Sequence, residues 1–145
     1  MANFSDRRIG SIVLADVTTA GGAITTNAGS FDLGFIPNGV VFIIDVTAAA
    51  TDTADTLNIT IETKIGAKWH PVYQSSEFLG DGGAKIESSD KISATGGTNH
   101  DTTFGGTLAA NAHLAILGVA WRVAYVQVDG DGDASFAFTV TAAVM

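Results

Sequence analysis

The chain has 145 residues, of which 46% are hydrophobic and 15% charged, and its formal net charge is -8 at pH 7. At this length a folded chain buries roughly 70% of the surface it exposes when unfolded, so one domain with a substantial core is expected. The 15 acidic residues, against 7 basic ones, repel phosphate backbones and argue against nucleic acid and anionic membranes as partners. Cysteine is absent, which excludes disulfides, thiolate metal sites and a cysteine nucleophile.

The first eight residues, MANFSDRR, are polar, and we expect them to form a short N-terminal arm before a single domain over residues 9–145. They lack the basic and then apolar regions of a signal peptide. The longest unbroken aliphatic or aromatic run, residues 40–44, is too short to span a bilayer. Synthesis in the cytoplasm is therefore expected.

Apolar residues recur at a period of two, and helical periodicity is missing, so the sequence predicts an all-β fold. The alternation is clearest in TLNITIETK and SFAFTVTAA, which favour half-buried strands of a sandwich or barrel. Of the two, we expect an antiparallel β-sandwich of jelly-roll-like type. The residues expected to face inward there are Leu57, Ile59, Ile61, Phe136, Phe138, Val140 and Ala142. Further strands are expected over residues 9–17, 30–36, 40–46, 68–74 and 114–128, the last interrupted by Gly118.

Pro37, Asn38 and Gly39 separate two of these strands and predict a hairpin turn. Proline presets φ at one central position, and Asn-Gly tolerates positive φ. The following strand, VVFIIDV, is apolar on both faces. Such a strand is either covered on both sides within the fold or presents one face to another subunit.

Residues 81–111 form the least hydrophobic stretch of the chain. Because a structureless connection of this length is uncommon, it either contains short strands, for instance around Ile86 and Ile92, or is an excursion that binds a partner. Polarity and expected mobility point to Lys85, Lys91 and His100 in this stretch as candidate partner contacts. Arg7 and Arg8 of the arm are candidates for the same reason.

The run DGDGD, starting at Asp129, resembles site chemistry most closely. An EF-hand calcium loop needs acids at positions 1, 3 and 5, glycine at 6 and glutamate at 12. Asp129, Asp131 and Asp133 supply the acids, but Ala134 and Val140 occupy the other two positions. We interpret the run as a hairpin turn, with weak binding of a cation at the surface as the alternative.

No pattern indicates catalysis. His70, His100 and His113 are scattered and are expected at the surface or an interface, and the Gly-x-Ser-x-Gly and His-Glu-x-x-His motifs do not occur. We therefore expect no enzyme activity, no catalytic residues, no cofactor and no dedicated metal site. Trp69 and Trp121 lie in segments whose apolar residues alternate as in a strand, so both are expected in the core. Trp69 is near a polar turn and is therefore the better candidate for exposure and for contact with a partner.

Two segments resemble a family of small structural proteins of tailed bacteriophages. TDTADTLNITIETKIGAKWHPVYQ, residues 51–74, is similar to a strand pair whose second strand carries a tryptophan. WRVAYVQVDGDGDASFAFTVTAAV, residues 121–144, is similar to the family's final hairpin, whose two strands are joined by a Gly/Asp turn. Together these segments cover about a third of the chain.

The resemblance implies a virion β-sandwich protein made in the host cytoplasm, most like a capsid decoration or cement protein. It would bind the major capsid protein on the outer head surface and self-associate, as a homotrimer in many members. A carbohydrate-binding or host-recognition module on a phage tail or virion surface is the alternative, and it requires an exposed aromatic residue.

Overall fold

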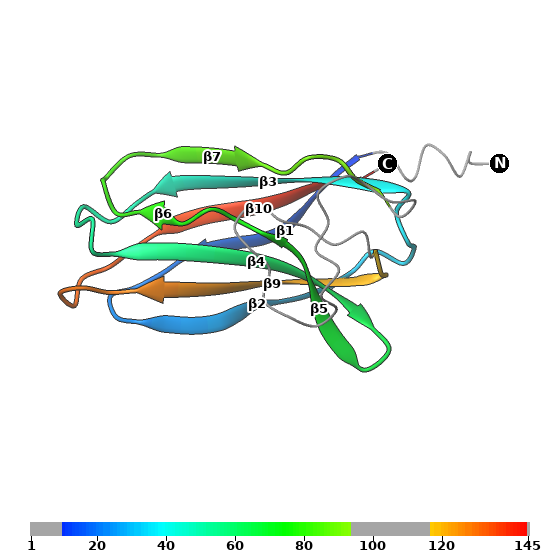
Figure 1. Cartoon of the computed structure of the whole chain (residues 1–145), viewed down its shortest axis with the longest axis horizontal. Helices are drawn as coiled ribbons and strands as arrows, with labels where there is room; N and C mark the ends of the chain where they lie inside the picture. The colour runs from blue at the N-terminus through cyan, green and yellow to red at the C-terminus, as the bar shows by residue number, and fades with distance from the viewer. Residues whose placement is uncertain (1–9, 94–116, 145) are drawn as a thin grey trace.

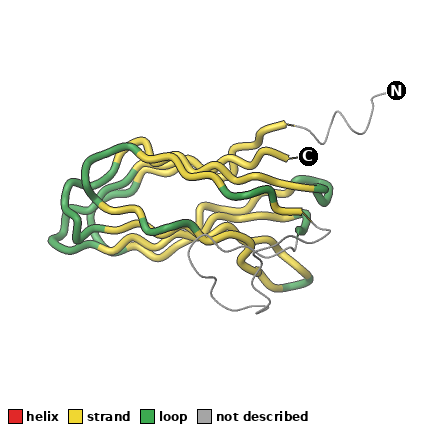
Figure 2. Tube along the Cα trace, turned by 45° about the horizontal axis from the view of Figure 1, so that its top comes forward, coloured by secondary structure: helices red, strands yellow, loops and turns green. Residues whose placement is uncertain are grey.

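Two antiparallel sheets pack face to face in the computed structural model, which describes residues 10–93 and 117–144 (Figures 1 and 2). These residues include no helix that is long and apolar enough to cross a membrane. The strands are β1 (Gly10–Thr18), β2 (Ile24–Asp32), β3 (Gly39–Ala48), β4 (Thr56–Ile65), β5 (Lys68–Gln74), β6 (Phe78–Leu79), β7 (Lys85–Ser88), β8 (Ile92–Ser93), β9 (Ala120–Val128) and β10 (Ala137–Val144).

The strand order confirms the predicted sandwich. Sheet A runs β1-β10-β3-β7 with the short β8 beside β3, and sheet B runs β2-β9-β4-β5 with the short β6 beside β4. Without the two-residue strands, eight strands form two four-stranded sheets, and most connections carry the chain from one sheet to the other. This is the arrangement of a jelly roll, which pairs strands that are distant in sequence.

The core lies between the sheets and is built from alternate residues, as predicted. Leu57, Ile59 and Ile61 of β4 are fully buried, and so are Phe138 and Val140 of β10 to within 1%. Burial of each large apolar side chain contributes about 1.5–3 kcal/mol of transfer free energy. The residues that alternate with them point outward and are only partly buried, so the outer face of each sheet is partly exposed.

Two sequence-based interpretations around the β2–β3 connection are wrong. The strand expected over residues 30–36 is β2 (Ile24–Asp32), whose alternation is broken by positive φ at Gly29 and a register shift between Asn27 and Ser30. The turn at Pro37 is not a hairpin, because β2 belongs to sheet B and β3 to sheet A. Local turn chemistry marked a change of direction but could not show which sheet the next strand joins.

The polar stretch begins with two short strands at the predicted places, β7 around Ile86 and β8 at Ile92. Both pair with β3, Ile86 opposite Asp45 and Ile92 opposite Val40. Residues 94–111 lie outside the described residues. The long strand expected from residue 114 begins at Ala120 in the part of the chain that the structure describes.

Four loops lie together at one end of the sandwich, on the left in Figure 1. Each joins a strand of one sheet to a strand of the other. We call this end the crossover end and define it by residues 19–23, 49–55, 80–84 and 129–136. A main-chain hydrogen bond from Gly82 N to Ala50 O (2.7 Å) links two of the loops.

Candidate functional site

The DGDGD run lies at the crossover end. It is a turn, but not the predicted hairpin, because β9 and β10 belong to different sheets. The Asp129 Oδ1 atom accepts the backbone N–H groups of Asp131 (3.1 Å) and Gly132 (2.6 Å). These bonds, mainly that of Gly132, hold the pKa of Asp129 below its ordinary value. Asp129 therefore shapes the loop, and positive φ at Gly132 completes it.

The other two aspartates of the run face a third carboxylate. Carboxylate oxygens of Asp131, Asp133 and Asp55 lie within 4.8 Å of one another. Asp55 stands immediately before β4 and is buried, whereas Asp131 and Asp133 are exposed. A hydrogen bond with the Asp133 carboxyl, together with its charge, raises the pKa of Asp131. The sequence did not indicate Asp55, because nothing near it marks a site.

The environment of the two tryptophans matches the sequence-based interpretation. Trp121 is 1% exposed, and its Nε1 donates to Gly118 O (3.0 Å) inside the core. Trp69 is half-buried on the outer side of sheet B. The Arg122 guanidinium lies 4.6 Å from the Trp69 ring centroid, and Lys64 Nζ lies 5.9 Å from it. Part of the ring is thus occupied by side chains of the protein itself.

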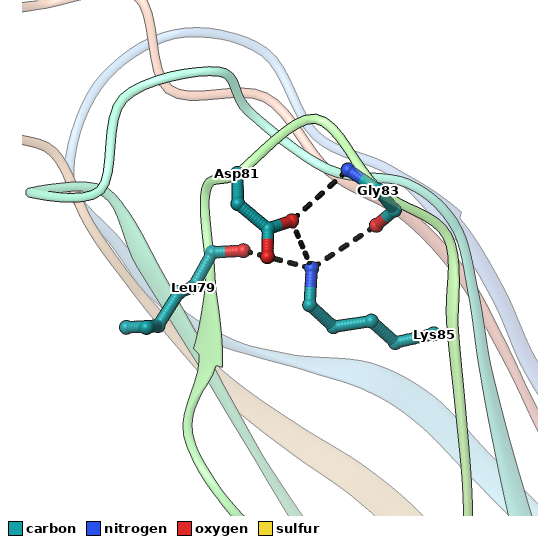
Figure 3. Close-up of polar contacts among 4 residues, drawn as sticks. All are labelled: Leu79, Asp81, Gly83 and Lys85. Atoms are coloured by element: carbon teal, nitrogen blue, oxygen red, sulfur yellow. Dashed lines mark hydrogen bonds and ion pairs between the residues drawn. The ribbon is translucent and has the colours of Figure 1, made fainter.

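Lys85 is engaged within its own loop (Figure 3). Its ammonium pairs with the Asp81 carboxylate and donates to the carbonyl oxygens of Leu79 (3.1 Å) and Gly83 (3.1 Å). The hydrogen bond from Lys85 is the main cause that lowers the pKa of Asp81. A partner that bound Lys85 would have to compete with these contacts.

Of the remaining candidate contacts, Lys91 is the one that lies among the described residues. Lys91 is exposed, and its aliphatic stem passes close to Gly39. Arg7, Arg8 and His100 lie outside the residues that the structure describes. His70, expected at a surface or an interface, is instead only 6% exposed on β5.

Glu87 is a partly buried carboxylate on β7 that binds the other sheet. Its Oε1 accepts the Tyr73 hydroxyl (2.6 Å) and the Ser76 backbone N–H (3.1 Å). Burial, and then the hydrogen bond and charge of Glu87, raise the pKa of Tyr73. These contacts join β7 of sheet A to β5 and the segment after it, which is a structural role.

Within the described residues, several exposed apolar side chains gather on the outer face of sheet A. Paired residues of adjacent strands point to the same side of a sheet. On this side Val13 is 57% exposed, Ile43 37% and Ile86 73%. We define the outer face of sheet A by Val13, Asp16, Val41, Ile43, Asp45, Ile86, Ser88, Thr139, Thr141 and Ala143.

The composition of this face follows the two-sided pattern of VVFIIDV. The inward side chains of β3 are buried, namely Val40, Phe42, Ile44 and Val46. Ile43, on the opposite side of the strand, is 37% exposed. The face has hydroxyl side chains and two acids but no basic residue. Few strongly hydrated charges would therefore have to lose water if another surface covered it. The sequence indicated the β3 part; the contributions of β1 and β7 depend on register.

Comparison with known proteins yields a likeness in fold. No family model matches the chain, and no curated protein matches it in sequence. A chain in the solved structure of infectious bursal disease virus, Gx strain, is similar, with a TM-score of 0.55 and 15% sequence identity. The match covers 94% of the present chain but 31% of the viral chain. At this identity the likeness concerns the β-sandwich fold.

Proposed function

We propose that the protein is a non-enzymatic structural component of a virion, namely a capsid decoration protein of a tailed bacteriophage. The observation that carries the proposal is the outer face of sheet A, where Ile43 and Val13 are exposed beside hydroxyl side chains in the part of the chain that the structure describes. The fold likeness to a chain of a virus structure supports a virion role. The resemblance of residues 51–74 and 121–144 to phage structural proteins supports the finer assignment.

The proposed mechanism is adhesive. The sandwich is a rigid body, copies of the chain associate by burying outer faces of sheet A as a homotrimer, and the cluster binds the major capsid protein on the outer head surface. Anything that binds only the assembled shell shifts the equilibrium toward that shell. Because the contact is repeated over many sites, a modest free energy per contact is sufficient to stabilise the shell.

Ile43→Asp tests the role of the outer face of sheet A. Burial of an isoleucine contributes about 1.5–3 kcal/mol, and each 1.4 kcal/mol corresponds to about tenfold in affinity. Loss of the homotrimer would lower the number of contacts that each particle makes with the shell, so we expect the variant to lose at least about tenfold in co-sedimentation with heads assembled without this protein. Circular dichroism of the variant should remain that of a β-sandwich, because Ile43 points away from the core.

Val126→Asp is the matched control. Val126 is 40% exposed, close to the 37% of Ile43, and lies on β9 in the other sheet. This variant should co-sediment like the unmodified protein. Equal binding by the Ile43 and Val126 variants would remove the outer face of sheet A from the proposal.

A carbohydrate-binding or host-recognition module is the alternative function, and half-buried Trp69 is the observation that favours it. Sugar rings stack on open aromatic faces, whereas Arg122 and Lys64 already approach this ring. Glycan-array binding that disappears in Trp69→Ala would support the alternative, and an array without binding would count against it.

A further inference from the structure

We propose that Asp55, Asp131 and Asp133, brought together from two inter-sheet loops, bind a divalent cation of the calcium type at the crossover end. Nothing in the adhesive function requires these carboxylates. Their oxygens nevertheless lie within 4.8 Å of one another at the junction of the β3–β4 and β9–β10 loops. Two Ca–O bonds of about 2.3–2.6 Å each can bridge such a separation.

The environment of Asp55 is the observation that distinguishes this group from an ordinary acidic surface. Asp55 is 0% exposed, and its Oδ1 accepts the Gly130 N–H (2.8 Å). Its Oδ2 is buried and accepts no hydrogen bond from any residue in the described ranges. A buried carboxylate oxygen without a partner is costly, and a bound cation would supply that partner.

The main chain holds Asp55 in place before any ion binds. Its N–H donates to Asp52 O (3.0 Å), and its carbonyl oxygen accepts the Gly80 N–H (2.9 Å). The β9–β10 loop approaches so closely that a Cβ on Gly130 would lie 2.6 Å from the Ala54 Cβ. The two loops are therefore already docked, and little reorganisation is needed to present the carboxylates.

The chemistry of the group selects a hard cation. All three ligands are carboxylates, and neither histidine nor cysteine belongs to the group. Asp131 and Asp133 stand on a glycine-containing loop, which suits the flexible coordination of Ca²⁺ better than the strict octahedron of Mg²⁺.

The experiment uses the full chain, freed of metal with a chelator and titrated with CaCl₂ by isothermal calorimetry at fixed ionic strength. We expect one site per chain with a Kd on the order of 10⁻⁴ M, as in other modestly charged calcium modules. The melting temperature should rise by several degrees in saturating CaCl₂, because the ion binds the folded chain. MgCl₂ should have a smaller effect.

Three substitutions locate the site. Asp131→Asn and Asp133→Asn change exposed side chains, so both variants should fold and each should lose at least tenfold in calcium affinity. Asp55→Asn keeps an oxygen for the Gly130 N–H and should lose the calcium-induced rise in melting temperature. Asp90→Asn, which removes an exposed carboxylate between β7 and β8, is the charge-matched control and should bind like the unmodified chain.

Two results would overturn the proposal. One is the lack of both binding heat and a thermal shift in the unmodified chain at millimolar CaCl₂. The other is an equal thermal shift in the unmodified chain, Asp131→Asn and Asp133→Asn, which would mark general screening of the negative net charge.

Discussion

Gln127 joins two inter-sheet loops through one buried amide. It is 1% exposed, and its Nε2 donates to the carbonyl oxygens of Ala20 (3.1 Å), Gly22 (2.8 Å) and Ala134 (3.1 Å). Its Oε1 accepts the Thr19 hydroxyl. Each buried polar group left without a partner costs about 1–3 kcal/mol. We expect Gln127→Met to lower the free energy of unfolding by about 2–5 kcal/mol in urea denaturation.

Gln74→Met makes the same chemical change at a half-buried position. The Nε2 bonds of Gln74 to Ile59 O (3.3 Å) and Ser75 O (3.4 Å) are longer. The Thr60 hydroxyl that donates to Gln74 Oε1 is only half-buried, so water can replace the lost acceptor, and the expected loss is below about 1 kcal/mol. If the two variants lose equal stability, the amide of Gln127 does not have the role assigned to it.

Tyr73 gives stability a dependence on alkaline pH. Its pKa is raised above the ordinary value of 10.0 by burial and by Glu87. The folded state therefore keeps its proton where the unfolded state releases it, so this stabilisation is complete below about pH 10 and declines as the pH rises further. Urea unfolding at pH 8 and pH 10.5 should show a smaller loss for Tyr73→Phe than for the unmodified protein. Equal losses would contradict the raised pKa.

Which residues form sites was only partly predictable at this scale. The sequence identified Asp129, Asp131 and Asp133 as unusual, and we interpreted all three as parts of a turn. Only Asp129 stabilises the turn, because its carboxylate accepts two backbone N–H groups of the loop. The partner of the other two, Asp55, is 75 residues from Gly130, whose N–H it binds. No motif of contiguous residues can reveal such a group.

Among the glycines of the described residues, the tightest main-chain contact is at Gly80, where the β6–β7 connection crosses the β3–β4 loop. A Cβ on Gly80 would overlap the carbonyl oxygen of Asp52 and come within 3.0 Å of the Ala50 Cβ. Because the obstacle is main chain, Gly80→Ala must displace a loop, and we expect a loss of about 1–3 kcal/mol. Thermal and urea unfolding measure it.

Gly10→Ala is the control for the same substitution without an obstacle. A Cβ at Gly10, the first residue of β1, meets nothing within 4 Å. Its effect should lie within about 0.5 kcal/mol of zero, as for most surface substitutions. A Gly80 variant as stable as this control would show that the two loops are not held in contact.

Elements with strong local signals were predictable, and their partners were not. Alternation located β4 and β10, and β5 (Lys68–Gln74) has the predicted bounds. Pro37-Asn38-Gly39 and the DGDGD run were correctly interpreted as changes of direction but wrongly as hairpins. Turn residues report local φ and ψ, whereas the choice of sheet depends on long-range pairing. The predicted jelly-roll-like sandwich is confirmed, but the order of the strands within each sheet followed from the structure.

At the scale of the molecule, the two sheets use their faces differently. Their inner faces form one core between β3, β4, β9 and β10. The outer face of sheet B carries the ion pair of Arg122 with Glu62 beside the exposed Val126 and Val128. The outer face of sheet A combines exposed apolar residues with hydroxyls and two acids and has no basic residue. Exposed apolar residues without neighbouring cations gain from being covered, which suits an adhesive subunit.

The thermal stability of virion heads tests the proposed decoration function most directly. Heads assembled without this protein would be incubated with the purified chain, separated from unbound protein and melted by differential scanning calorimetry. We predict that the chain stays with the heads and that their melting temperature rises in proportion to occupancy. Protein that remains in the supernatant, with an unchanged melting temperature of the heads, would contradict the account.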